Sequence, residues 1–142
     1  MRATYDALLR QSAIDGERIA CVGFCMGGRV SFLANLILPL RAAISFYGGG
    51  IAKSERGPGL LERVKDSHAP SFLFWGGRDK HIGPEQRQAI SEALRDAQKT
   101  FASMEFADAD HAFFNDTRPN YNKAAAEQAW VLSKAFLKSN LG

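Results

Sequence analysis

The chain has 142 residues, of which 46% are hydrophobic and 23% charged, and its formal net charge is +3. This length predicts a single domain over 1–142, and because no run of about 18 apolar residues occurs, the sequence excludes a membrane span. Lys and Arg are interleaved with Asp and Glu, and the N-terminus lacks the apolar core of a signal peptide, so we expect a soluble cytoplasmic protein without nucleic acid or membrane as a partner.

The first part of the chain alternates between helical and extended patterns. Residues 2–11 carry apolar positions at helical spacing, and residues 19–24 are apolar on both faces, as a strand of a parallel sheet is. Residues 26–37 again show helical spacing, which Pro39 ends. Residues 42–50 predict a second strand that runs into a glycine loop.

The second part continues this alternation. We expect a loop with a short helix in 57–67, a strand and tight turn in 69–79, a helix over 83–98, a strand over 101–107 and a final helix over 121–140. Strands that alternate with helices form βαβ units, so the predicted fold class is α/β, with a parallel sheet of about four strands and flanking helices. In such sheets, functional sites lie at the carboxyl ends of the strands.

Cys25 directly follows the first predicted strand, in the pattern Gly23-Phe24-Cys25-Met26-Gly27. This is the nucleophile elbow G-x-S-x-G with Cys in the Ser position; its turn is so sharp that side chains two positions either way are expected to clash. The N-terminus of the following helix favours a thiolate, and the Met26 backbone N–H can stabilise an oxyanion. We therefore predict that Cys25 is a nucleophile; the alternative is a buried structural cysteine in a tight turn.

The remaining cysteine and two of the three histidines have plainer interpretations. Cys21 lies in mid-strand and is expected to pack as a small apolar residue. In an extended segment its Cα lies ~13 Å from that of Cys25, beyond the ~7 Å limit of a disulfide, so both thiols should be free. His68 is expected at the surface and His81 in a pocket wall. No His is spaced with Cys as zinc ligands are, so no metal is predicted.

An acid and the third histidine follow two later strands. The chain order Cys25, Asp79, His111 is that of the triads in α/β-hydrolases, and the three strand ends converge on one edge of the sheet. His111 would take the Cys25 proton and Asp79 would orient the ring. Asp108 and Asp110 compete for the acid role, but they adjoin His111 and are expected to cap its loop; Asp79 itself could be a turn residue.

Four segments together carry a family resemblance: "GFCMGGR", "FYGGG", "FWGGRDKHI" and "DHAFFNDTRPNYN". They resemble the dienelactone hydrolase family, a branch of the α/β-hydrolases that uses Cys where most relatives use Ser. The resemblance spans nearly the whole chain but only the C-terminal part of the family. It implies hydrolysis of a small ester or lactone through an acylated Cys25, with Asp79 and His111 completing the triad and no metal or organic cofactor.

One departure from the family concerns the substrate. Family members carry an arginine four residues after the triad histidine, where it binds the substrate carboxylate; this chain has Asn115 there, and Arg118 is not equivalent. We therefore expect small neutral esters to be preferred over anionic lactones. The residues predicted to contact the substrate, beside Met26 at the oxyanion, are Phe24, Tyr47, Trp75, Ile82, Phe113, Phe114 and Asn115.

The other departure is that the family's early strands have no counterpart, nor has the loop that supplies a second oxyanion donor and a glutamate. Strand 19–24 is therefore expected to have a bare edge, which invites association. Three explanations stay open: a homodimer, another polypeptide that completes the sheet, or a natural start other than Met1. The function is accordingly a cysteine hydrolase or, alternatively, a weakly active or inactive domain for binding or assembly, or an incomplete piece of a longer hydrolase.

Overall fold

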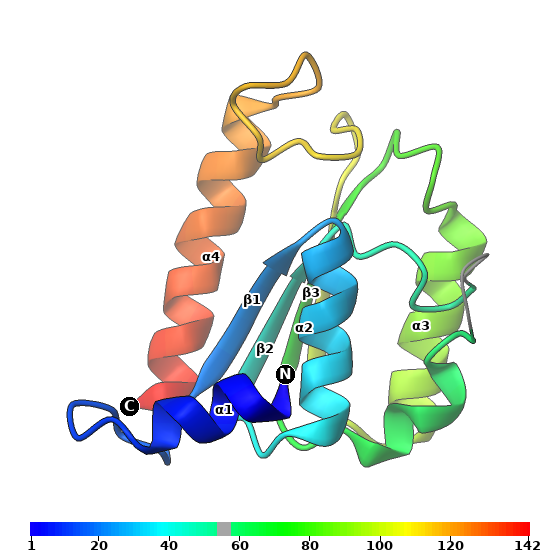
Figure 1. The fold of residues 1–142 in the computed structure, drawn as a ribbon. Coiled ribbons are helices and arrows are strands. Elements are labelled where there is room, and N and C mark those ends of the chain that lie inside the picture. The colour runs from blue at the N-terminus through cyan, green and yellow to red at the C-terminus, as the bar shows by residue number, and fades with distance from the viewer. Residues whose placement is uncertain (54–57) are drawn as a thin grey trace.

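The computed structural model describes residues 1–53 and 58–142, which form a sheet flanked by helices (Figure 1). The elements in chain order are α1 (Arg2–Leu9), β1 (Ala20–Phe24), α2 (Met26–Ile37), β2 (Ala42–Phe46), the 3-10 helix η1 (Leu61–Asp66), β3 (Ser71–Gly76), α3 (Pro84–Asp96), β4 (Phe101–Phe106) and α4 (Lys123–Leu141). The four strands are parallel and lie in the order β1-β2-β3-β4. The predicted α/β class and the number of strands are therefore confirmed.

Element boundaries differ from the prediction mainly at strand ends. The strand predicted over 42–50 ends at Phe46, because Tyr47 adopts a φ of 38° and turns the chain out of the sheet. The short helix expected within 57–67 is η1, and Gly57 lies outside the described residues.

The sheet lies between α4 on one side and α2 and α3 on the other (Figure 1). Helix α2 packs on β1 and β2, whereas α4 packs on β2 and β3. Strands β2 and β3 are buried along their whole length. No helix of the described residues is long and apolar enough to cross a bilayer.

A ladder of phenylalanine rings crosses the sheet near the carboxyl ends of its strands. Phe24 of β1 stacks on Phe46 of β2 with ring centroids 4.6 Å apart, and Phe46 stacks on Phe74 of β3 at 4.7 Å. The strand register places these three residues side by side. Each such pair contributes ~0.5–1.5 kcal/mol to stability beyond the burial of its apolar area. The stacked rings therefore stabilise the end of β1 directly before Cys25.

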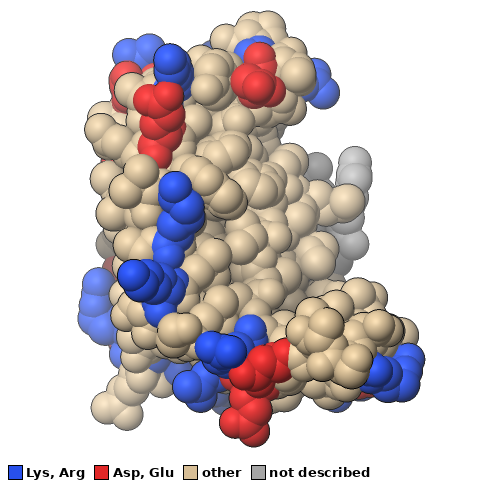
Figure 2. Space-filling view, turned by 90° about the vertical axis from the view of Figure 1, so that its left-hand side faces the viewer, with Lys and Arg blue, Asp and Glu red and all other residues tan. Residues whose placement is uncertain are grey.

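The outer side of β1 is the open edge of the sheet. Its composition suggests a central strand, yet Val22 and Phe24 are 36% and 38% exposed, because in the described part of the chain no strand pairs beyond β1. Figure 2 shows this side of the molecule: between the charged stripe of α4 and the end of α1 lies a broad surface without Lys, Arg, Asp or Glu. The expectation of a bare edge is therefore confirmed.

Candidate active site

Cys25 forms a sharp turn between β1 and α2. It adopts a φ of 54°, its N–H donates to the Phe46 carbonyl at 3.0 Å, and its own carbonyl accepts from Gly28 N–H at 2.9 Å. A Cβ at Gly23 would collide with the carbonyl oxygen of Gly27, so glycine is required at Gly23. The backbone thus presents the Cys25 side chain at the N-terminus of α2, where it is solvent-exposed.

The second glycine of the predicted motif proves not to be the tight one. A Cβ at Gly27 would meet nothing within 4 Å, whereas a Cβ at Gly28 would lie 2.6 Å from the Phe46 carbonyl oxygen and 2.9 Å from Gly48 Cα. The expectation of a clash at Gly27 was therefore wrong. The close approach that demands glycine comes one residue later, where α2 crosses the end of β2.

The structure brings Cys25, His111 and Asp79 together in one chain of hydrogen bonds. His111 Nε2 lies 3.2 Å from Cys25 Sγ, and His111 Nδ1 lies 2.7 Å from Asp79 Oδ2. The second carboxylate oxygen, Asp79 Oδ1, accepts from the backbone N–H of His81 at 2.7 Å and of Ile82 at 3.1 Å. The three side chains follow three different strands, so the parallel sheet alone places them at one edge.

This geometry shifts the pKa values of the histidine and the acid in opposite directions. The hydrogen bond to Asp79 raises the pKa of His111 to about 9, against an opposing effect of burial and with support from Cys25. Burial by itself would raise the pKa of Asp79, but the hydrogen bonds from His111, His81 and Ile82 outweigh it and lower that pKa. The site therefore stabilises an imidazolium between an anionic carboxylate and the thiol.

Four of the predicted substrate contacts lie near the thiol, and three of them reach the surface. Phe24 adjoins Phe114, with ring centroids 5.1 Å apart, and Met26 is 74% exposed. Tyr47 is buried beneath them, its ring 5.2 Å from that of His111. Burial raises the pKa of the Tyr47 phenol to about 12, with a contribution from the negative charge of a Cys25 thiolate. Tyr47 therefore stays protonated at physiological pH.

The other predicted substrate contacts are placed differently. Trp75, Ile82 and Phe113 belong to the hydrophobic core, with at most 2% of each residue exposed, and Trp75 Nε1 donates to Ser103 Oγ at 2.9 Å. These apolar side chains fill the space beneath the loops, so the structure does not bring them to the surface beside Cys25. Asn115 is exposed, but its side-chain oxygen accepts from the N–H and hydroxyl of Thr117 and closes a turn.

The competing acids and the other histidines occupy separate positions. Asp110 accepts from the backbone N–H of His111 at 2.6 Å, and Asp108 accepts from Asn122, so both brace the His111 loop as expected. The ring of His81 stands edge-on to that of His111, with centroids 5.3 Å apart. Cys21 is partly buried against the small core cluster around Tyr5, and both cysteines are free.

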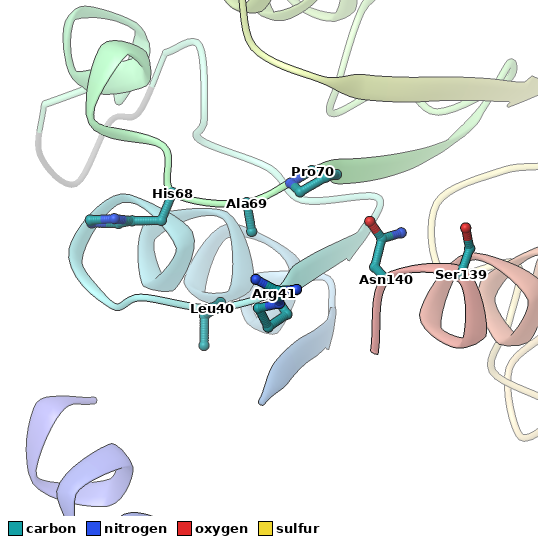
Figure 3. A pocket seen from close by; sticks show the side chains of 7 residues that line it. All are labelled: Leu40, Arg41, His68, Ala69, Pro70, Ser139 and Asn140. Atoms are coloured by element: carbon teal, nitrogen blue, oxygen red, sulfur yellow. The ribbon is translucent and has the colours of Figure 1, made fainter. Parts of the chain in front are cut away.

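A surface hollow lies at the opposite, amino ends of the strands (Figure 3). It is lined by Leu40, Arg41, His68, Ala69, Pro70, Ser139 and Asn140. The His68 ring is exposed and points away from the other labelled side chains. The hollow contains none of the residues of the Cys25 hydrogen-bond chain. Within the described residues, no cluster of three His, Cys, Asp or Glu side chains is suited to a metal ion.

One buried charged residue was missed at the level of sequence. Arg87 is 8% exposed and donates from Nη1 to the carbonyls of Gly76 and Ile82, both at 2.9 Å. An arginine in an amphipathic helix is normally expected at the surface. Helical spacing could have indicated that Arg87 is buried, because it stands three positions before Ile90 and seven before Leu94, on the buried face of α3.

The chain is similar to known proteins in both sequence and structure. Residues 1–141 match the model of the dienelactone hydrolase family. The chain is 35% identical over 122 residues to a protein of Saccharolobus solfataricus and 36% identical over 119 residues to one of Escherichia coli K12, both described as "Putative carboxymethylenebutenolidase". These alignments cover 86% and 82% of this chain but 44% of each relative, so the chain spans about half the length of these relatives.

A solved structure is similar over almost the whole chain. The crystal structure of a "Putative Dienelactone Hydrolase" from Klebsiella pneumoniae superposes with a TM-score of 0.89 at 28% identity, covering 96% of this chain and 58% of that one. The predicted partial α/β-hydrolase fold is therefore confirmed.

Proposed function

Because the chain belongs to the dienelactone hydrolase family, we propose that it hydrolyses small carboxyl esters or lactones through Cys25, with His111 and Asp79 as its catalytic partners. The observation that carries this proposal is the continuous hydrogen-bond chain from Cys25 Sγ through both nitrogens of His111 to Asp79. Its members come from the ends of three strands, and a purely structural cysteine needs no such arrangement. The two free thiols support the cytoplasmic location expected from the sequence.

The chemistry proceeds in two balanced half-reactions. The Cys25 thiolate attacks the carbonyl carbon of the ester, and the oxygen that gains the negative charge lies toward the N–H groups of the first turn of α2, Met26 first. When the tetrahedral intermediate collapses, His111 gives its proton to the leaving alkoxide and an acyl-thioester remains. Water then attacks that thioester, His111 accepts a proton from it, and the carboxylic acid leaves while the Cys25 thiolate is regenerated beside protonated His111.

The surroundings of Cys25 favour a neutral substrate. Phe24, Met26 and Phe114 offer apolar surface beside the thiol, and Asn115, at the position of the family's arginine, is engaged in its own turn. A substrate carboxylate would therefore lack a bidentate cationic partner at that position.

The direct test uses a p-nitrophenyl ester and the intact mass of the protein. A burst of nitrophenol should accompany an acyl adduct that Cys25→Ala abolishes and Cys21→Ala preserves. Adducts on Cys21 or on a lysine, or equal turnover by Cys25→Ala, would rule the proposal out.

We also propose that the β1 edge is covered by a second chain, either another copy in a homodimer or a different polypeptide that completes the sheet. Exposed Val22 and Phe24 on an unpaired strand support this. The same edge favours the second candidate function, a domain that has weak activity by itself and acts within an assembly. Turnover by the isolated chain, measured against its mass in solution, separates the two candidates.

A further inference from the structure

Among the described residues, Arg87 of α3 is the most deeply buried Lys or Arg, and its side chain bonds groups around the loop that carries Asp79. Its Nη1 bonds the Gly76 and Ile82 carbonyls, and its Nη2 lies 3.2 Å from Glu105 Oε2. Burying a guanidinium is costly unless its donors are used, so these partners are what keep the side chain inside. The pair with Glu105 is half-exposed and adds little by itself.

The two carbonyls that Arg87 binds enclose the loop of residues 77–81, which carries Asp79. Gly76 ends β3 and Ile82 is the next fully buried residue after the loop. One nitrogen atom therefore ties the start of this loop to its end. Loop closure by a buried, charge-assisted bond restricts the loop more than exposed turn contacts can.

Both residues bound by Arg87 also hold Asp79 directly. The Gly76 carbonyl accepts from Asp79 N–H at 3.3 Å, and Ile82 N–H donates to Asp79 Oδ1 at 3.1 Å. The Gly76 carbonyl oxygen thus accepts from both the guanidinium and Asp79 N–H. Ile82 accepts from the guanidinium through its carbonyl, while its N–H donates to the carboxylate. Moving those groups by a few tenths of an ångström moves Asp79 Oδ2 relative to His111 Nδ1.

We infer that Arg87 is a positioning residue, which holds the Asp79 carboxylate in register with His111 through the carbonyls of Gly76 and Ile82. Hydrogen bonds to Asp79 and the charge of His111 lower the pKa of Asp79, and the Arg87 cation is not among these causes. The effect of Arg87 on Asp79 is therefore geometric. This inference rests on the proposed function only in that the Asp79–His111 pair activates Cys25.

The test is a double-mutant cycle read by alkylation of Cys25 with iodoacetamide, in a Cys21→Ala background so that one thiol reports. Alkylation does not require ester turnover, so the inference and the proposed function can fail separately. Arg87→Met should slow alkylation at neutral pH by on the order of 10- to 100-fold, as expected for a misplaced catalytic pair. The midpoint of the plot of alkylation rate against pH should shift to higher pH. Arg87→Lys should recover part of the rate, and Arg95→Met, an exposed arginine of the same helix, should match the parent.

The decisive step is the same substitution in Asp79→Asn. If Arg87 acts through Asp79, Arg87→Met should change the alkylation rate there by less than about 2-fold, while the melting temperature still falls. Equal losses in both backgrounds, or no loss in either, overturn the inference. Should Arg87→Met fail to fold, Arg87→Lys enters the same cycle with the same criteria.

Discussion

His111 Nδ1 and Asp79 Oδ2 lie 2.7 Å apart at the junction of two loops that meet only because β3 and β4 are neighbours. Gly76 makes this junction possible, since a Cβ there would lie 2.7 Å from the carbonyl oxygens of Ala109 and Asp110. The N–H of Arg78 also bonds the Ala109 carbonyl at 2.9 Å. The acid and the histidine are therefore joined by backbone contacts as well as by their own hydrogen bond.

The first prediction concerns stability against pH. The pKa of His111 is raised from 6.5 to about 9, so its contribution to stability is complete below pH 6.5 and is lost as the pH rises through about 9. The loss should amount to at most about 3 kcal/mol, at ~1.4 kcal/mol per pKa unit. Thermal unfolding between pH 6 and 10 should show this decline, and His111→Asn should flatten it. A decline of the same size in His111→Asn would assign it to other groups.

The contribution of Asp79 to stability changes with pH in the opposite direction to that of His111. The pKa of Asp79 is lowered, so its contribution is present above its ordinary value of 3.8 and is lost as the pH falls through the lowered value. Asp79→Asn should accordingly cost most stability above pH 4 and progressively less below it. Urea unfolding at pH 3 and pH 6 measures this, and an equal cost at both values would contradict it.

The two adjacent glycines of α2 form a matched pair. Gly28→Ala should be strongly destabilising, by roughly 2–5 kcal/mol, because its Cβ would press on the Phe46 carbonyl and α2 must shift away from β2. Gly27→Ala should be neutral or stabilise by up to about 1 kcal/mol, since its surroundings are open and alanine favours a helix. Melting temperatures of the two variants provide the comparison; equal values would contradict the close approach at Gly28.

Replacing Cys25 by serine distinguishes thiol from alcohol chemistry in one geometry. A thiol is intrinsically a stronger nucleophile than an alcohol in the same position, so Cys25→Ser should lower kcat for a p-nitrophenyl ester by at least about 10-fold. Circular dichroism should show an unchanged fold. A serine variant as fast as the parent would mean that the site is tuned for an alcohol and that the thiol is incidental.

Substrate charge gives a further prediction. Without a bidentate arginine at the Asn115 position, an anionic lactone loses a hydrogen bond worth ~1.5–3 kcal/mol. We expect kcat/KM for a neutral ester to exceed that for an anionic lactone of similar size by roughly 10-fold or more. Steady-state kinetics at moderate and high salt measure the ratio, and a strong preference for the anionic lactone would refute it.

The sequence predicts that Cys25, Asp79 and His111 converge because Cys25 directly follows β1 and the other two lie in the loops after β3 and β4, and the carboxyl ends of parallel strands share one edge. It does not predict the tight position at Gly28, because the clash there comes from Phe46, a residue of another strand. Nor does it separate surface from core among the aromatics: Trp75 and Phe113 have the composition of a pocket wall, but only their packing shows that they lie in the core. Arg87 was missed because the two hydrogen-bond acceptors of its Nη1 are backbone carbonyls, which every residue carries.

The last prediction concerns the open edge of β1. Val22 lies in the middle of the edge strand β1 and is 36% exposed. Figure 2 shows a broad surface without charged residues beside the charged stripe of α4. Apolar side chains beside unpaired backbone groups favour pairing with another chain, and two copies related by a two-fold axis would cover both edges at once. We therefore expect a homodimer at micromolar concentration.

Light scattering should give twice the 15.6 kDa mass of one chain. Val22→Lys should return it to a monomer, because a charge on an edge strand opposes pairing, whereas Tyr121→Lys, a substitution of similarly exposed Tyr121 in the loop before α4, should leave the dimer intact. A stable wild-type monomer would refute the homodimer, and if that monomer also failed to turn over esters, the result would favour an incomplete piece of a longer hydrolase.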